Sequence, residues 1–263
     1  MRFAWATDVH LNFLGEEDRR RFLEKLEQFD VDGFLLGGDV AEADSLPGVL
    51  REAADVWRCP IYFVLGNHDF YRGSIGEVRA YARRETHKQA EIRWLGATGP
   101  VALTDDVALV GHDGWGDARN GDYWGSALSL TDFSLIGEFL GLDRSGRQRM
   151  LQSLGDEAAA SLAADLDAAG EGFRSVVVLT HVPPFPEACT TEGRIWRDDW
   201  LPFFTSRAVG EALLAAAEKR PRVKYLVLCG HTHRAGDATL RDNLRVVTGP
   251  AEYRAPIVQR FLR

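Results

Sequence analysis

Five short apolar runs in this chain each lead directly into aspartate, asparagine or histidine. Nearly continuous apolar runs of this length are typical of β-strands that are covered on both faces. In open α/β sheets, sites form outside the carboxyl ends of the strands, so polar groups that follow such strands can meet. The runs and the residues that follow them are 2–6 with Asp8 and His10, 33–37 with Asp39, 61–65 with Asn67, His68 and Asp69, 175–179 with His181, and 223–228 with His231 and His233.

Helical patterns separate several of these runs, which indicates a layered α/β fold. Residues 16–29 place apolar side chains on one face and charges on the other, and Ser74 is a suitable cap for a helix over 74–89. Further helices are expected over 156–170 and 206–220. The residues alone leave open whether the layers hold one sheet or two stacked sheets.

The last part of the chain has a different pattern. Residues 238–249 predict two short strands around Asp242 and Asn243, and residues 255–262 predict a third. We expect these strands to be antiparallel additions at a sheet edge. One more apolar run, at 107–110, completes the set of predicted strands.

Two stretches, 111–126 and 183–204, fit neither pattern and are rich in glycine, proline and aromatic residues. Long irregular stretches inside a compact domain are usually functional or poorly ordered, and abundant aromatic residues argue against disorder. We expect ordered loops at the rim of the site, where the usual role of aromatic residues is to pack the loops onto the core and their clustering offers a substrate platform as the second interpretation. The candidate substrate-binding residues are His112, Trp115, Arg119, Tyr123, Trp124, Arg194 and Trp196.

Composition excludes several classes of protein. The net charge of −8 does not suit a protein that coats a polyanion, which argues against a long nucleic acid as partner. No run of about 18 apolar residues predicts a membrane span, and we expect no signal peptide. The three cysteines, Cys59, Cys189 and Cys229, are scattered and predict no disulfide framework. We therefore expect a cytoplasmic protein with reduced thiols, whose oligomeric state the sequence does not indicate.

The residues at the strand ends are of the types that bind metal ions. Imidazole, carboxylate and amide oxygen together suit Mn, Fe, Zn, Co or Ni better than Mg or Ca, which prefer oxygen ligands alone. Five of the seven histidines belong to this set. The set is too large for one tetrahedral ion, and about right for two ions that share a carboxylate. Two metals about 3.5–4 Å apart form a clamp for in-line displacement at phosphorus.

Taken in order, these motifs resemble those of the calcineurin-like metallophosphoesterases. The motifs are Asp8-x-His10, Gly38-Asp39, Gly66-Asn67-His68-Asp69, His181 and Gly230-His231-Thr232-His233. The resemblance implies a single domain over 1–263 with a four-layer αββα sandwich, in which helices flank two mixed β-sheets. It also implies two divalent transition-metal ions, with Mn or Fe favoured.

The resemblance further implies a role for each motif residue. Asp8, His10, Asp39 and His233 would hold one metal, and Asp39, Asn67, His181 and His231 would hold the other, with Asp39 shared. A hydroxide between the metals would attack phosphorus. His68 would stabilise the transition state or protonate the leaving oxygen, and Asp69 would orient His68.

Each motif taken alone could have a purely structural role. The occurrence of all the motifs in this order argues against that explanation. Gly-Asp after a strand is commonly a turn or helix cap, and a single strand-end histidine is usually structural. A non-catalytic scaffold of this family would lack ligands, whereas none is missing here and His68 is present. We therefore expect an enzyme that hydrolyses a small phosphodiester or nucleotide-like phosphate ester. A phosphomonoesterase, including a protein phosphatase, is the alternative.

Overall fold

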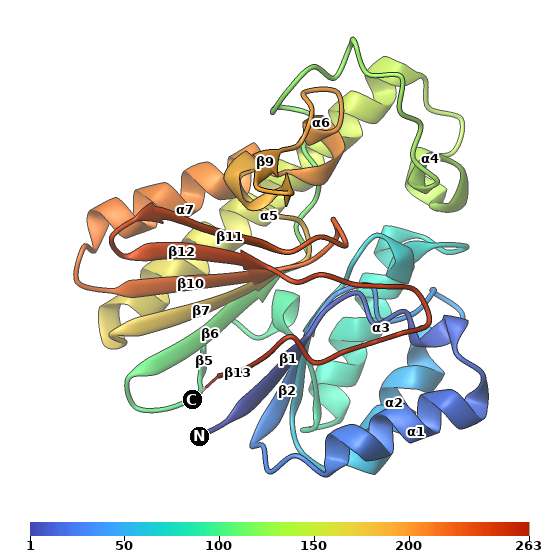
Figure 1. Cartoon of the computed structure of the whole chain (residues 1–263), viewed down its shortest axis with the longest axis vertical. Helices are drawn as coiled ribbons and strands as arrows, with labels where there is room; N and C mark the ends of the chain where they lie inside the picture. The colour runs from blue at the N-terminus through green and yellow to red at the C-terminus, as the bar shows by residue number, and fades with distance from the viewer. Residues whose placement is uncertain (263) are drawn as a thin grey trace.

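The computed structural model describes residues 1–262 and shows two β-sheets packed face to face between two layers of helices (Figure 1). The predicted four-layer fold with two mixed sheets is therefore confirmed. In spatial order, the first sheet contains β13 (Arg260–Leu262), β1 (Phe3–Ala6), β2 (Gly33–Gly37), β3 (Ile61–Val64) and β4 (Ile92–Trp94). The second contains β11 (Gly236–Arg241), β12 (Leu244–Thr248), β10 (Lys224–Cys229), β7 (Ser175–Thr180), β6 (Val107–His112) and β5 (Val101–Ala102).

The central strands of both sheets are parallel, and helices connect most of them, while β10 is connected to β12 through the edge strand β11. In the first sheet β1, β2, β3 and β4 are parallel, and in the second β12, β10, β7 and β6 are parallel. Helices α1 (Glu16–Glu27), α2 (Leu46–Trp57) and α3 (Ile75–Lys88) cover the outer face of the first sheet, and α5 (Arg144–Gly172) and α7 (Arg207–Lys219) cover that of the second (Figure 1). The sequence-predicted strands are therefore buried on both faces, as their continuous apolar character indicated.

Apolar side chains fill the space between the two sheets. Trp5, Leu35, Val64, Leu179 and Leu228 belong to one buried cluster to which both sheets contribute. Burying this surface stabilises the sandwich by roughly 25 cal/mol for each Å² removed from water. This packing fixes the two sheets against each other. The carboxyl ends of their strands are thereby held side by side, where they can form a shared site.

Several predicted boundaries differ from the structure. The long helix α5 begins at Arg144 rather than 156, where the Asp143 side chain accepts a 2.7 Å hydrogen bond from the Gly146 N–H. Helix α2 is an addition to the helices expected from the sequence, and its Pro47 lies in the first turn, where proline is tolerated. The Ser74 cap of α3 is confirmed, because its side chain accepts from the Glu77 N–H.

The C-terminal strands correct a second expectation. Strand β12 is parallel to β10, so of these tail strands only β11 is an antiparallel edge strand of that sheet, whose other edge strand, β5, is also antiparallel. Strand β13 pairs antiparallel with β1 in the other sheet, which brings the end of the chain beside its beginning (Figure 1). The predicted tail strands are thus divided between the two sheets.

The two predicted irregular stretches fold into short elements at one end of the molecule. They and their neighbours contribute α4 (Asp132–Leu135), α6 (Leu201–Phe204) and a hairpin of β8 (Thr190–Thr191) and β9 (Arg194–Ile195) (Figure 1). Within residues 1–262 no helix has the length and apolar character needed to span a bilayer, and the three cysteines are free.

Candidate metal centre

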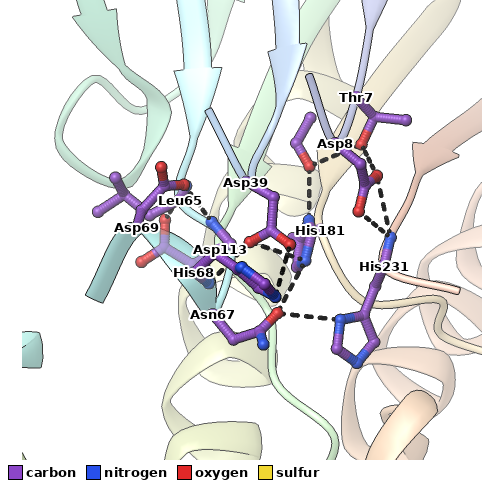
Figure 2. Close-up of polar contacts among 12 residues, drawn as sticks. Thr7, Asp8, Asp39, Leu65, Asn67, His68, Asp69, Asp113, His181 and His231 are labelled. Carbon is purple, nitrogen blue, oxygen red and sulfur yellow. Dashed lines mark hydrogen bonds and ion pairs between the residues drawn. The ribbon is translucent and has the colours of Figure 1, made fainter. Parts of the chain in front are cut away.

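The strand-end residues converge at the carboxyl edge of both sheets. Figure 2 shows Asp8, Asp39, Asn67, His181 and His231 pointing toward one another from strands of the two sheets. Because the carboxyl ends of the strands in the two sheets lie side by side, residues more than two hundred positions apart come into contact, as His10 and His233 do. The predicted convergence of these side chains is therefore observed.

The first metal position is formed by Asp8, His10, Asp39 and His233. One potential ligand atom from each of the four lies within 4.8 Å of all the others. His10 Nε2 is 3.2 Å from His233 Nε2 and 3.7 Å from Asp39 Oδ2. His233 Nε2 is also 3.4 Å from Asp8 Oδ1. The four residues predicted for one ion thus surround a single point.

The second metal position is formed by Asn67, His181 and His231 together with Asp39. The Asn67 Oδ1 atom is 3.2 Å from His181 Nε2 and 3.1 Å from His231 Nδ1. His181 Nε2 lies 3.5 Å from Asp39 Oδ1, so Asp39 faces both positions with its two oxygens.

Hydrogen bonds on the far side of each group decide which atoms face the second metal position. The His181 Nδ1 atom is 2.9 Å from the Gly37 carbonyl, and His231 Nε2 is 3.2 Å from the Phe203 carbonyl. A carbonyl only accepts, so these nitrogens carry the protons and the opposite ring nitrogens present lone pairs. Two lone pairs and the Asn67 amide oxygen therefore converge with no hydrogen between them. Such an arrangement of acceptors is favourable when a cation lies among them.

The spacing of the atoms also suits metal ions. Two ligand atoms bound to one ion at about 2.1 Å, with tetrahedral or octahedral angles, are about 3.0–3.4 Å apart. The distances of 3.1 and 3.2 Å at the second position and 3.2 Å between His10 and His233 at the first match this range. The residues present therefore fit two ions that share Asp39.

Backbone strain is concentrated at the same residues. Five of the seven predicted ligands have positive φ angles, which residues other than glycine rarely adopt. They are Asp8, His10, Asp39, His231 and His233. Glycines of the motifs make room for them: a Cβ at Gly66 would lie 2.1 Å from Asp39 Oδ1, and one at Gly230 1.9 Å from Asp8 Oδ2. The motif glycines are thus explained by close approach to the metal-facing carboxylates.

Burial keeps two of the histidines in the neutral form that binds a cation. Burial, reinforced by neighbouring histidines, lowers the pKa of His10 to about 2 and that of His231 to about 3, so both rings are neutral. Burial, with Asp8 and Asp69 close by, raises the pKa of Asp39 well above its usual range. Neutral imidazoles are the form that binds metal, and a crowded buried carboxylate gains most from a positive neighbour.

His68 stands beside the two metal positions rather than inside either. Its Nε2 is 3.9 Å from Asp39 Oδ2, its ring stacks on Tyr71 at 4.2 Å, and it lines the cleft above the centre. Burial lowers its pKa to about 4. This is the placement expected of a group that meets the substrate.

The predicted contact between Asp69 and the His68 ring is wrong. Asp69 instead accepts backbone N–H bonds from Val40 and Ala41, both 2.9 Å, and from Gly66, 2.8 Å. Among residues 1–262 the His68 Nδ1 atom has no hydrogen-bond partner. Asp69 therefore joins the β2 and β3 loops, and its influence on His68 passes through the backbone.

Two residues that support the centre were not found from the sequence. The Asn67 Nδ2 group donates to Asp132 Oδ1 at 2.9 Å and to the Tyr71 hydroxyl at 3.2 Å, and that hydroxyl donates to Asp132 Oδ1 at 2.7 Å. Asp132 and Tyr71 thereby turn the amide oxygen of Asn67 toward the metal position. Asn67 and Asp132 are 65 residues apart in the sequence, and no local sequence pattern predicts their contact.

The loop at 111–126 contains side chains that pack or pair rather than face the centre. Trp115 and Tyr123 are buried in the hydrophobic core, with Trp115 packed on Phe70 and Phe139, so their predicted substrate contact is wrong. The remaining candidates of this loop also lie outside the cleft: His112 is buried at the end of β6, Arg119 pairs with Asp117 and Asp156, and Trp124 is exposed beside Arg144.

The loop at 183–204, in contrast, does reach the centre. The metal cleft, a hollow of about 320 Å³ above Asp39, Asn67 and His68, has Trp196 in its wall. It adjoins a hollow of about 700 Å³, here called the side pocket, lined by Arg194, Trp196, Trp200, Arg234, Glu252, Tyr253 and their neighbours. Tyr253 was not singled out from the sequence, yet its ring lies 4.6 Å from that of His10.

A layered αββα fold with a buried Asp/His cluster at the strand ends defines a class of proteins, and comparison with known proteins identifies the family. The sequence profile of the calcineurin-like phosphoesterases matches residues 1–235. The chain belongs to this family.

Solved structures agree with this fold. A phosphopantetheinyl hydrolase from Mycobacterium tuberculosis is 17% identical, with 95% of this chain and 89% of that chain covered and a TM-score of 0.68. A dimetal phosphatase from Danio rerio is 14% identical, with 95% and 87% covered and a TM-score of 0.56. The protein TT1561 of Thermus thermophilus is 14% identical, with 95% and 88% covered and a TM-score of 0.54. No curated protein matches the sequence.

Proposed function

We propose that the chain is a dinuclear metal-dependent phosphoesterase. The observation that carries the proposal is the convergence of the His181 and His231 lone pairs with the Asn67 amide oxygen, 3.1 and 3.2 Å apart, beside the shared carboxylate of Asp39. These residues and the Asp8, His10 and His233 cluster would hold two divalent ions. Mn or Fe suits this mixture of imidazole and oxygen ligands.

The two ions would polarise the phosphoryl group and activate water. The chain's own residues would position the ester and handle its protons. A phosphate in the cleft would lie beside His68, whose pKa of about 4 an adjacent anion would raise. His68 can then donate a hydrogen bond to a phosphoryl oxygen or a proton to the leaving oxygen. Its stacking on Tyr71 holds the ring at the edge of the cleft.

We infer that the substrate is a small phosphodiester or nucleotide-like ester. We also propose that the protein acts in the cytoplasm. The cleft of about 320 Å³ accommodates a phosphate, and the larger adjoining side pocket can take a compact organic group. A phosphomonoester is the competing substrate class. A scaffold without activity is the third alternative, and the complete ligand set argues against it.

The decisive experiment measures metal content and hydrolysis together. Protein purified without chelator is expected to contain two transition-metal ions per chain and to hydrolyse bis-4-nitrophenyl phosphate faster than 4-nitrophenyl phosphate. Cyclic nucleotides and phosphopantetheinyl compounds extend the panel. Absence of metal, with no hydrolysis after addition of Mn or Fe, would remove the enzyme proposal. A clear preference for the monoester would make a phosphomonoester, rather than a phosphodiester, the proposed substrate.

Changing His68 to alanine tests its proposed role. The variant should keep its metals and lose roughly 10²–10⁴-fold in turnover, the usual contribution of a general acid or base. The loss should be smaller for nitrophenyl esters than for alkyl esters, because nitrophenolate leaves without a proton. Equal losses on both would assign His68 to electrostatic stabilisation instead.

A further inference from the structure

The side pocket differs in charge from the rest of the molecule. The chain carries a net charge of −8, yet three arginines line this hollow against one acid, Glu252. Arg197 is neutralised by Asp199, at 3.0 and 2.9 Å. Within residues 1–262, Arg194 and Arg234 have no ion-pair partner, and both are exposed. Two free guanidinium groups therefore face a hollow that opens onto the metal cleft.

Flat aromatic rings form the wall between the side pocket and the metal cleft. Trp196, Trp200 and Tyr253 line both hollows, so the two are continuous. The rings of Trp196 and Trp200 meet edge to face at 5.3 Å, and both pack on Phe204, which in turn packs on His231 at 4.8 Å. A row of rings thus leads from a metal-facing histidine outward into the side pocket.

The hairpin β8–β9 fixes these groups in place. Its turn residues Glu192 and Gly193 both have positive φ, the conformation that tight two-residue hairpins require. Arg194 starts the returning strand, and the Trp196 indole donates a 2.9 Å hydrogen bond to the Thr191 hydroxyl. The arginine and the indole are therefore presented by one small ordered element.

We propose that the side pocket binds the organic part of the substrate, and that this part is a nucleotide carrying a second phosphate. The inference rests on the proposed function, since it places the scissile phosphate in the metal cleft. The base would stack on Trp196, and the second phosphate would bind Arg194 and Arg234. Glu252 would accept a hydrogen bond from a sugar hydroxyl or a base N–H. Arginine forks suit phosphate, and indole faces suit any base.

The size of the side pocket supports this assignment. Its volume of about 700 Å³ falls in the range of roughly 300–1,000 Å³ that is common for sites of drug-sized ligands. Two free arginines provide charge for one or two phosphates, whereas a polyanion would meet the acidic surface beyond them. A compact bisphosphate therefore fits the site better than a strand of nucleic acid.

The test compares adenosine 5′-monophosphate with adenosine 3′,5′-bisphosphate in calorimetric binding to the full chain as purified. The bisphosphate should bind more tightly by roughly tenfold to a hundredfold, as expected for charge-assisted hydrogen bonds. The double variant Arg194→Ala/Arg234→Ala should remove this advantage. Arg222→Ala, an exposed arginine before β10 at the opposite end of the sheet, should retain it.

The ring contact is tested separately. Trp196→Ala should weaken the binding of both nucleotides by roughly fivefold or more, and Trp196→Phe should restore most of it, as expected for stacking worth about 1–3 kcal/mol per base. Equal affinity of the wild-type chain for the two nucleotides, or an advantage that survives loss of both arginines, would overturn the phosphate assignment. Unchanged affinities in Trp196→Ala would overturn the base assignment.

Failure of this inference is distinguishable from failure of the proposed function. Hydrolysis of bis-4-nitrophenyl phosphate by wild-type protein with Mn is measured in parallel and does not depend on a nucleotide. Hydrolysis without nucleotide discrimination would leave a phosphoesterase with a different substrate. Discrimination without any hydrolysis would leave a nucleotide-binding protein.

Discussion

The two proposed metal positions share Asp39 but are supported in different ways. At the first position, Asp8, His10 and His233 are held by groups close to the strand ends. Thr7 donates to Asp8 Oδ2 at 2.6 Å, and the His231 N–H also donates to Asp8. At the second position, the Asn67 amide is turned by Asp132 of α4, and the His231 ring by the Phe203 carbonyl of α6.

This difference teaches that one half of the centre follows from the sheets alone, while the other also needs the segments inserted between them. Helices α4 and α6 lie in regions that the strand pattern does not define. A change in either helix should therefore reach the second position and leave the first unaffected. The comparison makes distinct predictions for variants of the shared carboxylate, of α4 and of Thr7.

Removing the shared carboxylate should have the largest effect. In Asp39→Asn, both positions lose an anionic ligand, and only a carboxylate can serve two ions in this way. We expect loss of both metals and near-complete loss of activity. Elemental analysis and turnover measure this, with His233→Ala as the comparison, which should lose chiefly one metal. Full metal content and normal turnover in Asp39→Asn would contradict the shared centre.

Removing the support from α4 should affect one position. In Asp132→Ala, the Asn67 amide loses its strongest orienting partner, and a change of this kind typically weakens metal affinity by about 10–100-fold. We expect a biphasic Mn titration in which only one of the two binding steps weakens. Tyr71→Phe, which keeps the Asp132 contact, should weaken that step less. Equal weakening of both steps would show that the two halves are not separable.

The pH dependence should act on both positions together, because it arises at Asp39. Burial raises the pKa of Asp39 well above its usual range, so at a pH below that pKa a proton must leave as metal binds. The buried rings of His10 and His231, with pKa values of about 2 and 3, hold no competing proton near neutral pH. Metal affinity should rise with pH, by at most about tenfold per unit, and level off above the pKa of Asp39.

Calorimetry of Mn binding in buffers of different protonation enthalpy measures the released protons. At most one proton per chain is expected from Asp39, and its release should fall toward zero as the pH rises above the pKa of Asp39. Release of several protons would assign the dependence to histidines.

Much of the centre was predictable because its ligands follow a local rule. Each of the seven ligands comes just after an apolar strand, and the parallel packing of strands carries all of them to one edge. The supports were not predictable in the same way. Asp132 is one of many aspartates outside strands, and its role depends on a contact with Asn67 that only the folded chain creates.

The two aromatic loops show the same limit. Both are rich in glycine and tryptophan, yet Trp115 is 4% exposed and belongs to the core, whereas Trp196 lines the metal cleft. Composition predicted that both loops are ordered, and it could not separate packing from binding. The separation arises from topology: the first loop continues β6 into the layer beside Phe70, and the second crosses the end of the sheets.

The smallest effect is expected at the support of the first position. Thr7→Val removes the hydroxyl that donates to Asp8 Oδ2 but keeps the shape of this buried side chain. Asp8 retains the His231 N–H as a donor, so the loss should correspond to one hydrogen bond of about 0.5–1.5 kcal/mol, or roughly twofold to tenfold in metal affinity. In the Mn titration the step that weakens should be the one left intact by Asp132→Ala, and Thr7→Ser should behave like the wild type. If Thr7→Val and Asp132→Ala weaken the same step, the two supports act on one position, and the division of the centre into two halves is wrong.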